Sequence, residues 1–141
     1  PRHSYTYTRG MDPASLRTDA YPRDRRLIYG YSRPISVIIN ENAFSNAEIF
    51  AHAIKTIGRG KVVGTATYGG VISTGAASLI DGTNLRTPFR GWLLASDNAD
   101  MENNGTKPDL NIPLTPAHDA AGSDPQLEAA VAELLSRSAN K

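Results

Sequence analysis

The sequence contains no cysteine among its 141 residues. Disulfide bonds and thiolate metal sites are therefore excluded, and cysteine usage says nothing about the redox compartment. Only three histidines are present, and none belongs to a His-x-x-x-His or Glu-x-x-His pattern of the kind that binds zinc. We therefore expect no metal and no other cofactor, and the sequence leaves the cellular location open.

Long apolar runs and an excess of either charge are missing as well. No segment reaches the roughly 18 apolar residues that a transmembrane helix needs, and no signal sequence is visible. The 15 basic and 14 acidic residues give a formal net charge of +1. We therefore expect neither binding to nucleic acid nor a membrane span. A chain of this length with 40% hydrophobic residues predicts one domain with one core.

Residues 1–33 are rich in tyrosine, arginine, proline and aspartate, and they show almost no sustained period of 2 or 3.6. We interpret them as an extended, loop-rich arm that lies on a partner or continues a part further upstream. Residues 34–141 carry the regular patterns and form the second predicted unit. Because the first residue is proline, we expect the chain to be a processed or excised piece.

The clearest pattern is a strand, a helix and a second strand. The β-branched run 35–39 predicts a buried strand, and residues 61–67 predict another. Between them we expect a helix that ends at Gly58. One face of this helix should be buried, made of Ile49, Phe50, Ala53, Ile54 and Ile57. This order predicts a βαβ unit and the α/β class with a mixed sheet.

Further strands are predicted in the second half of the chain. Residues 76–80 and 84–96 should form two strands joined by Asp81-Gly82, a dipeptide that is typical of tight hairpins. A polar loop follows, and then residues 109–112 predict a short strand.

The chain is predicted to end in a helix, with Asp124 as its N-cap and Pro125 as its first residue. Its buried side chains should be Leu127, Val131, Leu134 and Leu135.

Ser45 lies at the mouth of the first predicted helix, where two interpretations are open. Ser45-Asn46-Ala47-Glu48 is a capping box, in which Glu48 reaches back to the Ser45 amide and stabilises the helix by roughly 1 kcal/mol. The first amides of a helix also have no intrahelical partner, so they can stabilise a developing oxyanion. A serine beside them is well placed to act as a nucleophile.

Four motifs follow one another with compatible spacing. They are Asn40-Glu41-x-x-Phe44-Ser45-Asn46-Ala47-Glu48-Ile49-Phe50, Gly60-Lys61-Val62-Val63-Gly64-x-x-Thr67-x-Gly69-Gly70-Val71-Ile72, Leu79-Ile80-Asp81-Gly82-x-x-Leu85-Arg86 and Met101-Glu102-Asn103-x-Gly105-x-x-Pro108-Asp109. Over residues 34–112 the chain resembles the carboxy-terminal catalytic portion of the tail-specific and tricorn-type serine peptidases, the S41 family. This resemblance implies a ClpP/crotonase-like fold, here as the partial core of a larger catalytic domain, and hydrolysis of peptide or protein substrates.

The resemblance also implies roles for particular residues. Ser45 would be the nucleophile that forms an acyl-enzyme, and the backbone amide of Asn46 would help to hold the oxyanion. Gly69 and Gly70 would form the turn that the substrate approaches. In one branch of the family this turn carries a lysine base; Gly70 stands at that position, which excludes a serine–lysine dyad. Glu102 matches the glutamate with which the tricorn branch orients, through a second serine, its histidine base.

No histidine of this chain is expected to be that base. In the tricorn branch, a Ser-His pair and a second oxyanion amide lie well upstream, before a PDZ-like module. His52 should lie about 10 Å further along the helix than Ser45. His118 falls in the predicted linker before the last helix, and His3-Ser4 has the reversed order of the family's pair. We therefore expect a nucleophile whose base lies upstream of Pro1, and little activity from this chain alone.

The alternative is a catalytically inactive ClpP/crotonase-like module that binds peptides or assembles, with Ser45 only a helix cap. Acyl-CoA chemistry is a third possibility that rests on fold analogy alone. In the first two cases we expect a homo-oligomer, because strand edges and apolar faces left open by an incomplete core need cover.

Overall fold

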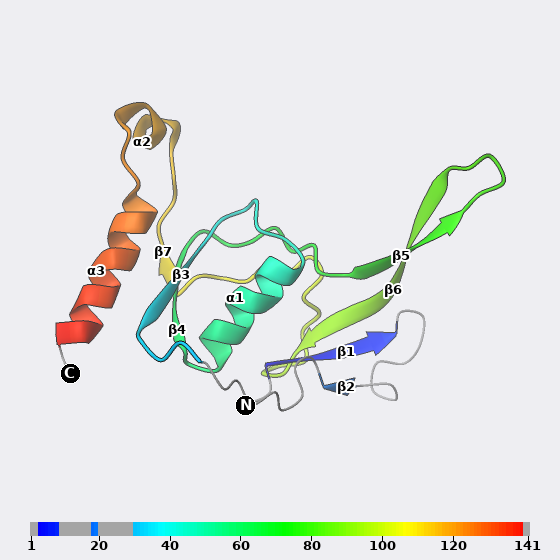
Figure 1. The fold of residues 1–141 in the computed structure, drawn as a ribbon, viewed down its shortest axis with the longest axis horizontal. Coiled ribbons are helices and arrows are strands. Elements are labelled where there is room, and N and C mark those ends of the chain that lie inside the picture. The colour runs from blue at the N-terminus through cyan, green and yellow to red at the C-terminus, as the bar shows by residue number, and fades with distance from the viewer. Residues whose placement is uncertain (1–2, 9–17, 20–29, 140–141) are drawn as a thin grey trace.

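The structure is a computed structural model that describes residues 3–8, 18–19 and 30–139. These residues form two sheets and three helices, shown in Figure 1. The antiparallel sheet has the strand order β2-β1-β6-β5, and the parallel sheet has the order β3-β4-β7. The strands are β1 Ser4–Thr8, β2 Thr18–Asp19, β3 Ile35–Ile39, β4 Gly60–Gly64, β5 Ser73–Ser78, β6 Asn84–Leu94 and β7 Leu110–Asn111. The helices are α1 Asn46–Thr56, α2 Pro116–Ala121 and α3 Pro125–Ala139.

The predicted βαβ unit is present as β3, α1 and β4. The two strands pair in parallel, with Ile35 opposite Gly60 and Ile39 opposite Gly64. The strand β4 ends at Gly64 and not at residue 67 as expected, because Gly64 has a φ of +125°, which turns the chain out of the ladder. Parallel pairs occur in one sheet and antiparallel pairs in the other, so the α/β class with both strand orientations is confirmed.

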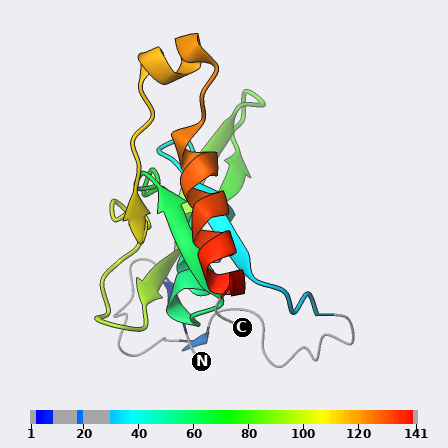
Figure 2. The same ribbon diagram turned by 90° about the vertical axis from the view of Figure 1, so that its left-hand side faces the viewer.

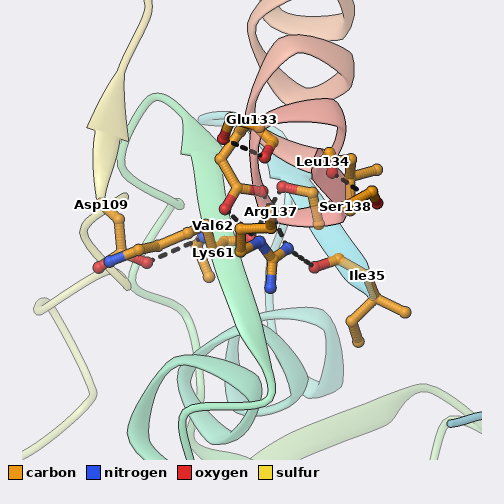
Figure 3. A network of polar contacts seen from close by, with 10 residues as sticks. Ile35, Lys61, Val62, Asp109, Glu133, Leu134, Arg137 and Ser138 are labelled. Carbon is orange, nitrogen blue, oxygen red and sulfur yellow. Dashed lines mark hydrogen bonds and ion pairs between the residues drawn. The ribbon is translucent and has the colours of Figure 1, made fainter. Parts of the chain in front are cut away.

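Helices α1 and α3 cover opposite faces of the parallel sheet, as Figures 1 and 2 show from two directions. On one face, Ala51 of α1 packs with Ile39 and Val62 in a buried cluster. On the other face, Arg137 of α3 donates a hydrogen bond of 2.6 Å to the Ile35 carbonyl at the start of β3 (Figure 3). The parallel sheet is thus the middle of three layers.

The helix α1 also packs against the antiparallel sheet. Its Ile49 lies against a second buried cluster that contains Val71, Trp92 and Met101. One helix therefore packs against both sheets through side chains one to two turns after Ser45.

The strand β1 was not predicted from the sequence. It pairs antiparallel with the second half of β6, from Ser4 opposite Leu94 to Thr8 opposite Arg90. Its sequence of alternating serine or threonine and tyrosine contains no aliphatic side chain, yet Ser4, Thr6 and Tyr7 are buried. The part of residues 1–33 that the structure describes thus includes two sheet strands, β1 and β2. Residues 1–2, 9–17 and 20–29 of this arm lie outside the described residues, and the expectation that the arm lies on a partner or continues a part further upstream stays a prediction.

The predicted hairpin is confirmed as β5 and β6, although β5 lies three residues earlier than expected at its start. The strands are joined by residues 79–83, in which Gly82 has a φ of +84°. Asp81 accepts hydrogen bonds from the Thr83 N–H and hydroxyl at 3.0 and 2.7 Å. Figure 1 shows that the hairpin projects away from the helices, and Ile80 at its tip is fully exposed.

The predicted buried face of α1 is partly wrong. Phe50 and Ile57 are exposed, at 57% and 42% of their surfaces. The buried residues are Glu48, Ala51 and Ile54, because the helix turns its polar Glu48 inward to meet other buried polar groups. The end of the helix is as expected, with Gly58 in the left-handed region at a φ of +69°.

The cap of α3 is confirmed, since Asp124 accepts a hydrogen bond of 2.9 Å from the Leu127 N–H. Its predicted buried face is wrong in three of four positions: Leu127, Val131 and Leu135 are exposed, and only Leu134 is half-buried. The helix contacts the sheet through a neighbouring face that carries Gln126 and Ala130.

In the predicted linker, residues 116–121 form the short helix α2. None of the helices in the described ranges has the length and apolar character needed to cross a membrane.

Candidate active site

Ser45 lies between the end of β3 and the start of α1, in a strained backbone conformation. Its φ and ψ angles are 59° and −124°, which residues with a side chain rarely adopt. Such strain costs on the order of 1–3 kcal/mol and persists only where surrounding contacts hold it. The Ser45 N–H makes two such contacts, donating to the Gly70 carbonyl and to the Glu48 carboxylate at 3.0 Å each. These bonds hold Ser45 in this conformation at the amino-terminal end of α1.

The Glu48 carboxylate is fully buried beside Ser45. Its Oε1 accepts hydrogen bonds from the N–H groups of Ser45 and Gly70, at 3.0 and 2.8 Å. Its Oε2 accepts from the Gly69 N–H at 2.7 Å and from the Thr67 hydroxyl. Four donors thus offset much of the cost of burying this charge. The predicted bond from the Ser45 amide to Glu48 is confirmed, and the other three were not predicted.

Glu102 binds the next two amides of the same segment. Its Oε2 accepts from the N–H groups of Val71 and Ile72, both at 2.8 Å. Its own N–H donates to Asp100 Oδ1 at 3.0 Å. The second oxygen, Oε1, accepts no hydrogen bond from the part of the chain that the structure describes. One oxygen therefore anchors the carboxylate, and the other can accept from a further donor.

Residues 69–72 connect Ser45 with Glu102. Each of their four N–H groups donates to a carboxylate, the first two to Glu48 and the last two to Glu102. The first two carbonyl groups accept from the N–H groups of Asn103 and Ser45, at 2.7 and 3.0 Å. The polar backbone groups of Gly69 and Gly70 are thus all engaged within the protein. Their role in substrate approach stays a prediction.

The segment that carries Glu102 packs closely against the glycine turn. A Cβ on Gly69, whose φ is +87°, would lie 3.1 Å from the backbone nitrogen of Gly105. A Cβ on Gly105 would lie 1.9 Å from the Thr67 carbonyl oxygen. Thr67 and Thr106 also bond to each other, because the Thr106 N–H donates to the Thr67 hydroxyl at 2.7 Å. Glycine at these two positions is what lets the two segments meet.

The Asn46 amide occupies the first position of α1, where an N–H has no partner within the helix. None of the described residues accepts its hydrogen. The following amide, of Ala47, donates to the Phe44 carbonyl at 3.3 Å. The Asn46 N–H is therefore free to donate to a ligand, as an oxyanion-stabilising group must be, and this role stays a prediction.

None of the three histidines hydrogen-bonds to Ser45. His52 Nε2 lies 3.1 Å from the carbonyl oxygen of His3. Burial lowers the pKa of the His52 imidazole below its ordinary value, and the bond to that carbonyl opposes the shift. His3 Nδ1 contacts the hydroxyl of the neighbouring serine at 2.8 Å, and His118 accepts a backbone N–H at the start of α2. Within the described residues, Ser45 thus has no imidazole base.

Asp109 joins the segment before β7 to β4, as Figure 3 shows beside Val62. Its Oδ2 accepts from the Val62 N–H at 2.9 Å, and its own N–H donates to the Val62 carbonyl at 2.7 Å. Lys55 Nζ of α1 lies 3.5 Å from Asp109 Oδ1. Asp109 was part of a predicted motif, but its structural role was not predicted. The sequence feature that could have indicated this role is an aspartate placed directly before a short strand.

A strained serine at a strand-to-helix turn, beside a free amide at the start of the helix, is an arrangement that occurs in α/β serine hydrolases. Comparison with known proteins narrows this class. The model of peptidase family S41 matches residues 2–112, and the chain belongs to this family.

The relatives include tricorn proteases. The chain is 37% identical over 124 residues to tricorn protease homolog 1 of Streptomyces coelicolor. The aligned residues cover 87% of this chain and 11% of the relative. It is 38% identical over 102 residues to the tricorn protease of Thermoplasma acidophilum, and this alignment covers 72% of this chain and 10% of the relative. The crystal structure of the tricorn protease matches with a TM-score of 0.66 at 37% identity, over 74% of this chain and 10% of that one. The resemblance to the tricorn type is confirmed.

A further solved structure supports the fold alone. A putative peptidase from Parabacteroides merdae matches with a TM-score of 0.70 at 23% identity, over 95% of this chain and 42% of that one. The family match begins at residue 2, well before residue 34 where the predicted motifs begin, so it includes β1. The chain spans about a tenth of the length of the tricorn relatives that it matches.

Proposed function

We propose that this chain is part of the catalytic domain of a tricorn-type serine peptidase in which Ser45 is the nucleophile. The observation that supports this best is the hydrogen-bonded connection from Ser45 through residues 69–72 to Glu102. A helix cap needs no fixed geometry relative to a distant carboxylate. A nucleophile needs one, because its base must be oriented toward it.

In the proposed reaction, Ser45 Oγ forms a bond to the carbonyl carbon of the scissile peptide, and its proton passes to a base outside these 141 residues. The Asn46 N–H stabilises the oxyanion. The C–N bond then breaks as the base gives the proton to the leaving amine, which leaves an acyl ester on Ser45. Water attacks this ester, releases the carboxylate product and restores the serine.

Glu102 is proposed to orient that base. Its Oε2 is held by two backbone amides, while Oε1 accepts from no described residue and can accept from a serine hydroxyl of the remaining domain. That serine would in turn orient a histidine, as the family resemblance implies. Peptides or proteins are the proposed substrates, and a homo-oligomer is the proposed assembly.

A catalytically inactive module of ClpP/crotonase-like fold, which binds peptides or assembles, is the second candidate. It is favoured by one observation: no imidazole or ammonium group among the described residues bonds to Ser45. Without a base, a serine hydroxyl is a poor nucleophile at neutral pH. In this case the strained Ser45 only begins the helix.

The test is Ser45→Ala in the full-length protein, assayed for peptide hydrolysis. We expect turnover to fall by at least about 1,000-fold, since a nucleophile acts as a unit with its base. Ser138→Ala is the matched control, because the Ser138 hydroxyl is exposed and bonds only within α3. Undiminished turnover in the Ser45 variant would overturn the assignment.

A fluorophosphonate probe distinguishes the two candidates in the same experiment. We expect it to label Ser45 in the full-length protein and to leave the 141-residue chain unlabelled. Absence of labelling in both, together with peptide binding, would favour the inactive module. Rapid labelling of the 141-residue chain would show that the base lies within it.

A further inference from the structure

The buried carboxylate of Glu48 has more polar contacts than a helix cap requires. A capping box uses this carboxylate for one bond, to the N–H of the capping residue. Glu48 makes that bond to Ser45 and three more to residues 67–70, which lie 19 to 22 residues further along the chain. The additional bonds therefore join separate segments of the fold and have no part in starting the helix.

These contacts form a continuous connection between the nucleophile and Glu102. Oε1 of Glu48 is shared by the N–H groups of Ser45 and Gly70, so one atom holds both the strained serine and the glycine turn. The Ser45 N–H donates to the Gly70 carbonyl as well. The next two N–H groups, of residues 71 and 72, bind Glu102. The turn therefore fixes the place of Ser45 relative to Glu102.

We propose that Glu48 is a positioning residue, which holds Ser45 in its strained conformation and fixes its place relative to Glu102. This inference rests on the proposed function, because positioning matters only for a serine that reacts. Glu48 contacts neither substrate nor oxyanion in this role. Its effect should appear in the rate of the chemical step, because a misplacement of about 1 Å can lower a rate by on the order of 100-fold.

Glu48→Gln is the sharpest change, because it preserves the shape of the side chain and alters only its hydrogen bonding. Each oxygen of Glu48 accepts from two donors. At least one donor of each pair is a backbone N–H, which can donate a hydrogen bond but cannot accept one. A glutamine places an NH₂ group at one of these positions. At least one backbone N–H then faces another donor and loses its acceptor, which destabilises this arrangement because an unsatisfied polar group in a buried site is costly.

In the full-length enzyme, we expect Glu48→Gln to lower kcat and the rate of fluorophosphonate labelling at Ser45 by about 100-fold. The KM should stay within about threefold of the original value, since substrate binding is not altered. Glu48→Asp retains both oxygens on a shorter side chain and should recover part of the rate. Glu133→Gln is the matched control on α3, where it removes a carboxylate paired with Arg137, and its labelling rate should be unchanged.

A merely structural role for Glu48 predicts a different result. Glu48→Gln would then reduce the amount of active enzyme, while kcat per labelled Ser45 stayed at the original value. Rates are therefore expressed per active site, counted with the fluorophosphonate. Unchanged kcat per site in this variant overturns the inference, and if the variant does not fold, Glu48→Asp is judged by the same criterion.

Amide hydrogen exchange in the 141-residue chain gives a readout that is independent of activity. We expect the Ser45, Gly69 and Gly70 amides to exchange faster in Glu48→Gln, while Val63 in β4 stays protected. Unchanged exchange at the first three amides overturns the inference even where Ser45 is reactive. Absence of labelling at Ser45 in the original full-length protein overturns the proposed function itself, so the two failures can be told apart.

Discussion

At the scale of single residues, buried polar side chains hold the candidate site together. Glu48, Thr67 and Thr106 are exposed over no more than 6% of their surfaces. They bond to one another, since the Thr67 hydroxyl donates to the Glu48 carboxylate and the Thr106 hydroxyl donates to the Glu48 carbonyl at 3.0 Å. In such a network each group needs its partner, because an unsatisfied polar group in a buried position is costly.

Gly105→Ala should disrupt this network. The added Cβ would lie 1.9 Å from the Thr67 carbonyl oxygen, so two backbone segments must separate. We expect the free energy of unfolding to fall by about 1–3 kcal/mol, as in other overpacked sites, measured by urea denaturation. Gly75→Ala is the control, because its Cβ would meet only Phe89 Cδ1 at 3.9 Å, an ordinary contact. Equal stability of the two variants would contradict this account of Gly105.

The sequence predicted part of this site. The capping bond to Glu48 follows from spacing within one helix turn, and Ser45 and Glu102 were assigned through the order of four motifs. The bonds from Glu48 to residues 67–70 could not be predicted, because no local pattern shows which distant amides will reach a buried carboxylate. Only the fold brings these segments together.

At the scale of elements, prediction succeeded for the βαβ unit, which the β-branched run of β3 and the glycine after α1 indicated correctly. The expected burial of β3 was only partly right, because Ile39 is buried while Ile38 is exposed over 42% of its surface. The strand β1 was missed because it contains no aliphatic side chain: two of its buried residues, Ser4 and Thr6, are polar, and the third is Tyr7. The buried face of α3 was wrong because Gln126 and Ala130 meet the sheet while the leucines beside them stay exposed.

Met101→Ala tests the cluster beneath the antiparallel sheet. Met101 is 1% exposed and packs with Val71 and Trp92, so its removal leaves a cavity. We expect the free energy of unfolding to fall by about 2–5 kcal/mol, measured by urea denaturation. Leu135→Ala on α3 should change it by less than about 0.5 kcal/mol, because that side chain is 65% exposed. A small effect at Met101 would show that this cluster is not part of the cooperative core.

At the scale of the whole molecule, the described residues expose more large apolar side chains than they bury. Fifteen large hydrophobic residues are exposed, against eleven hydrophobic residues in the core. Exposed apolar side chains that form a continuous group indicate an interface. The most regular group is on α3, where Leu127, Val131 and Leu135 recur every four residues and so lie along one face of the helix. The tip of the β5–β6 hairpin carries another group, Leu79 and Ile80, and Figure 1 shows this hairpin on the opposite side of the molecule from α3.

We expect the 141-residue chain to associate with itself through the exposed apolar face of α3. We expect sedimentation velocity to show larger species as the concentration rises above about 10 μM, which corresponds to a micromolar dissociation constant. Replacing Leu127 and Leu135 by glutamine should shift the chain toward the monomer, because it removes two of the three apolar groups from the helix face. Ile80→Gln at the hairpin tip is the control and should leave the association unchanged. A monomer at every concentration would mean that the exposed face of α3 is not covered by a second copy of this chain.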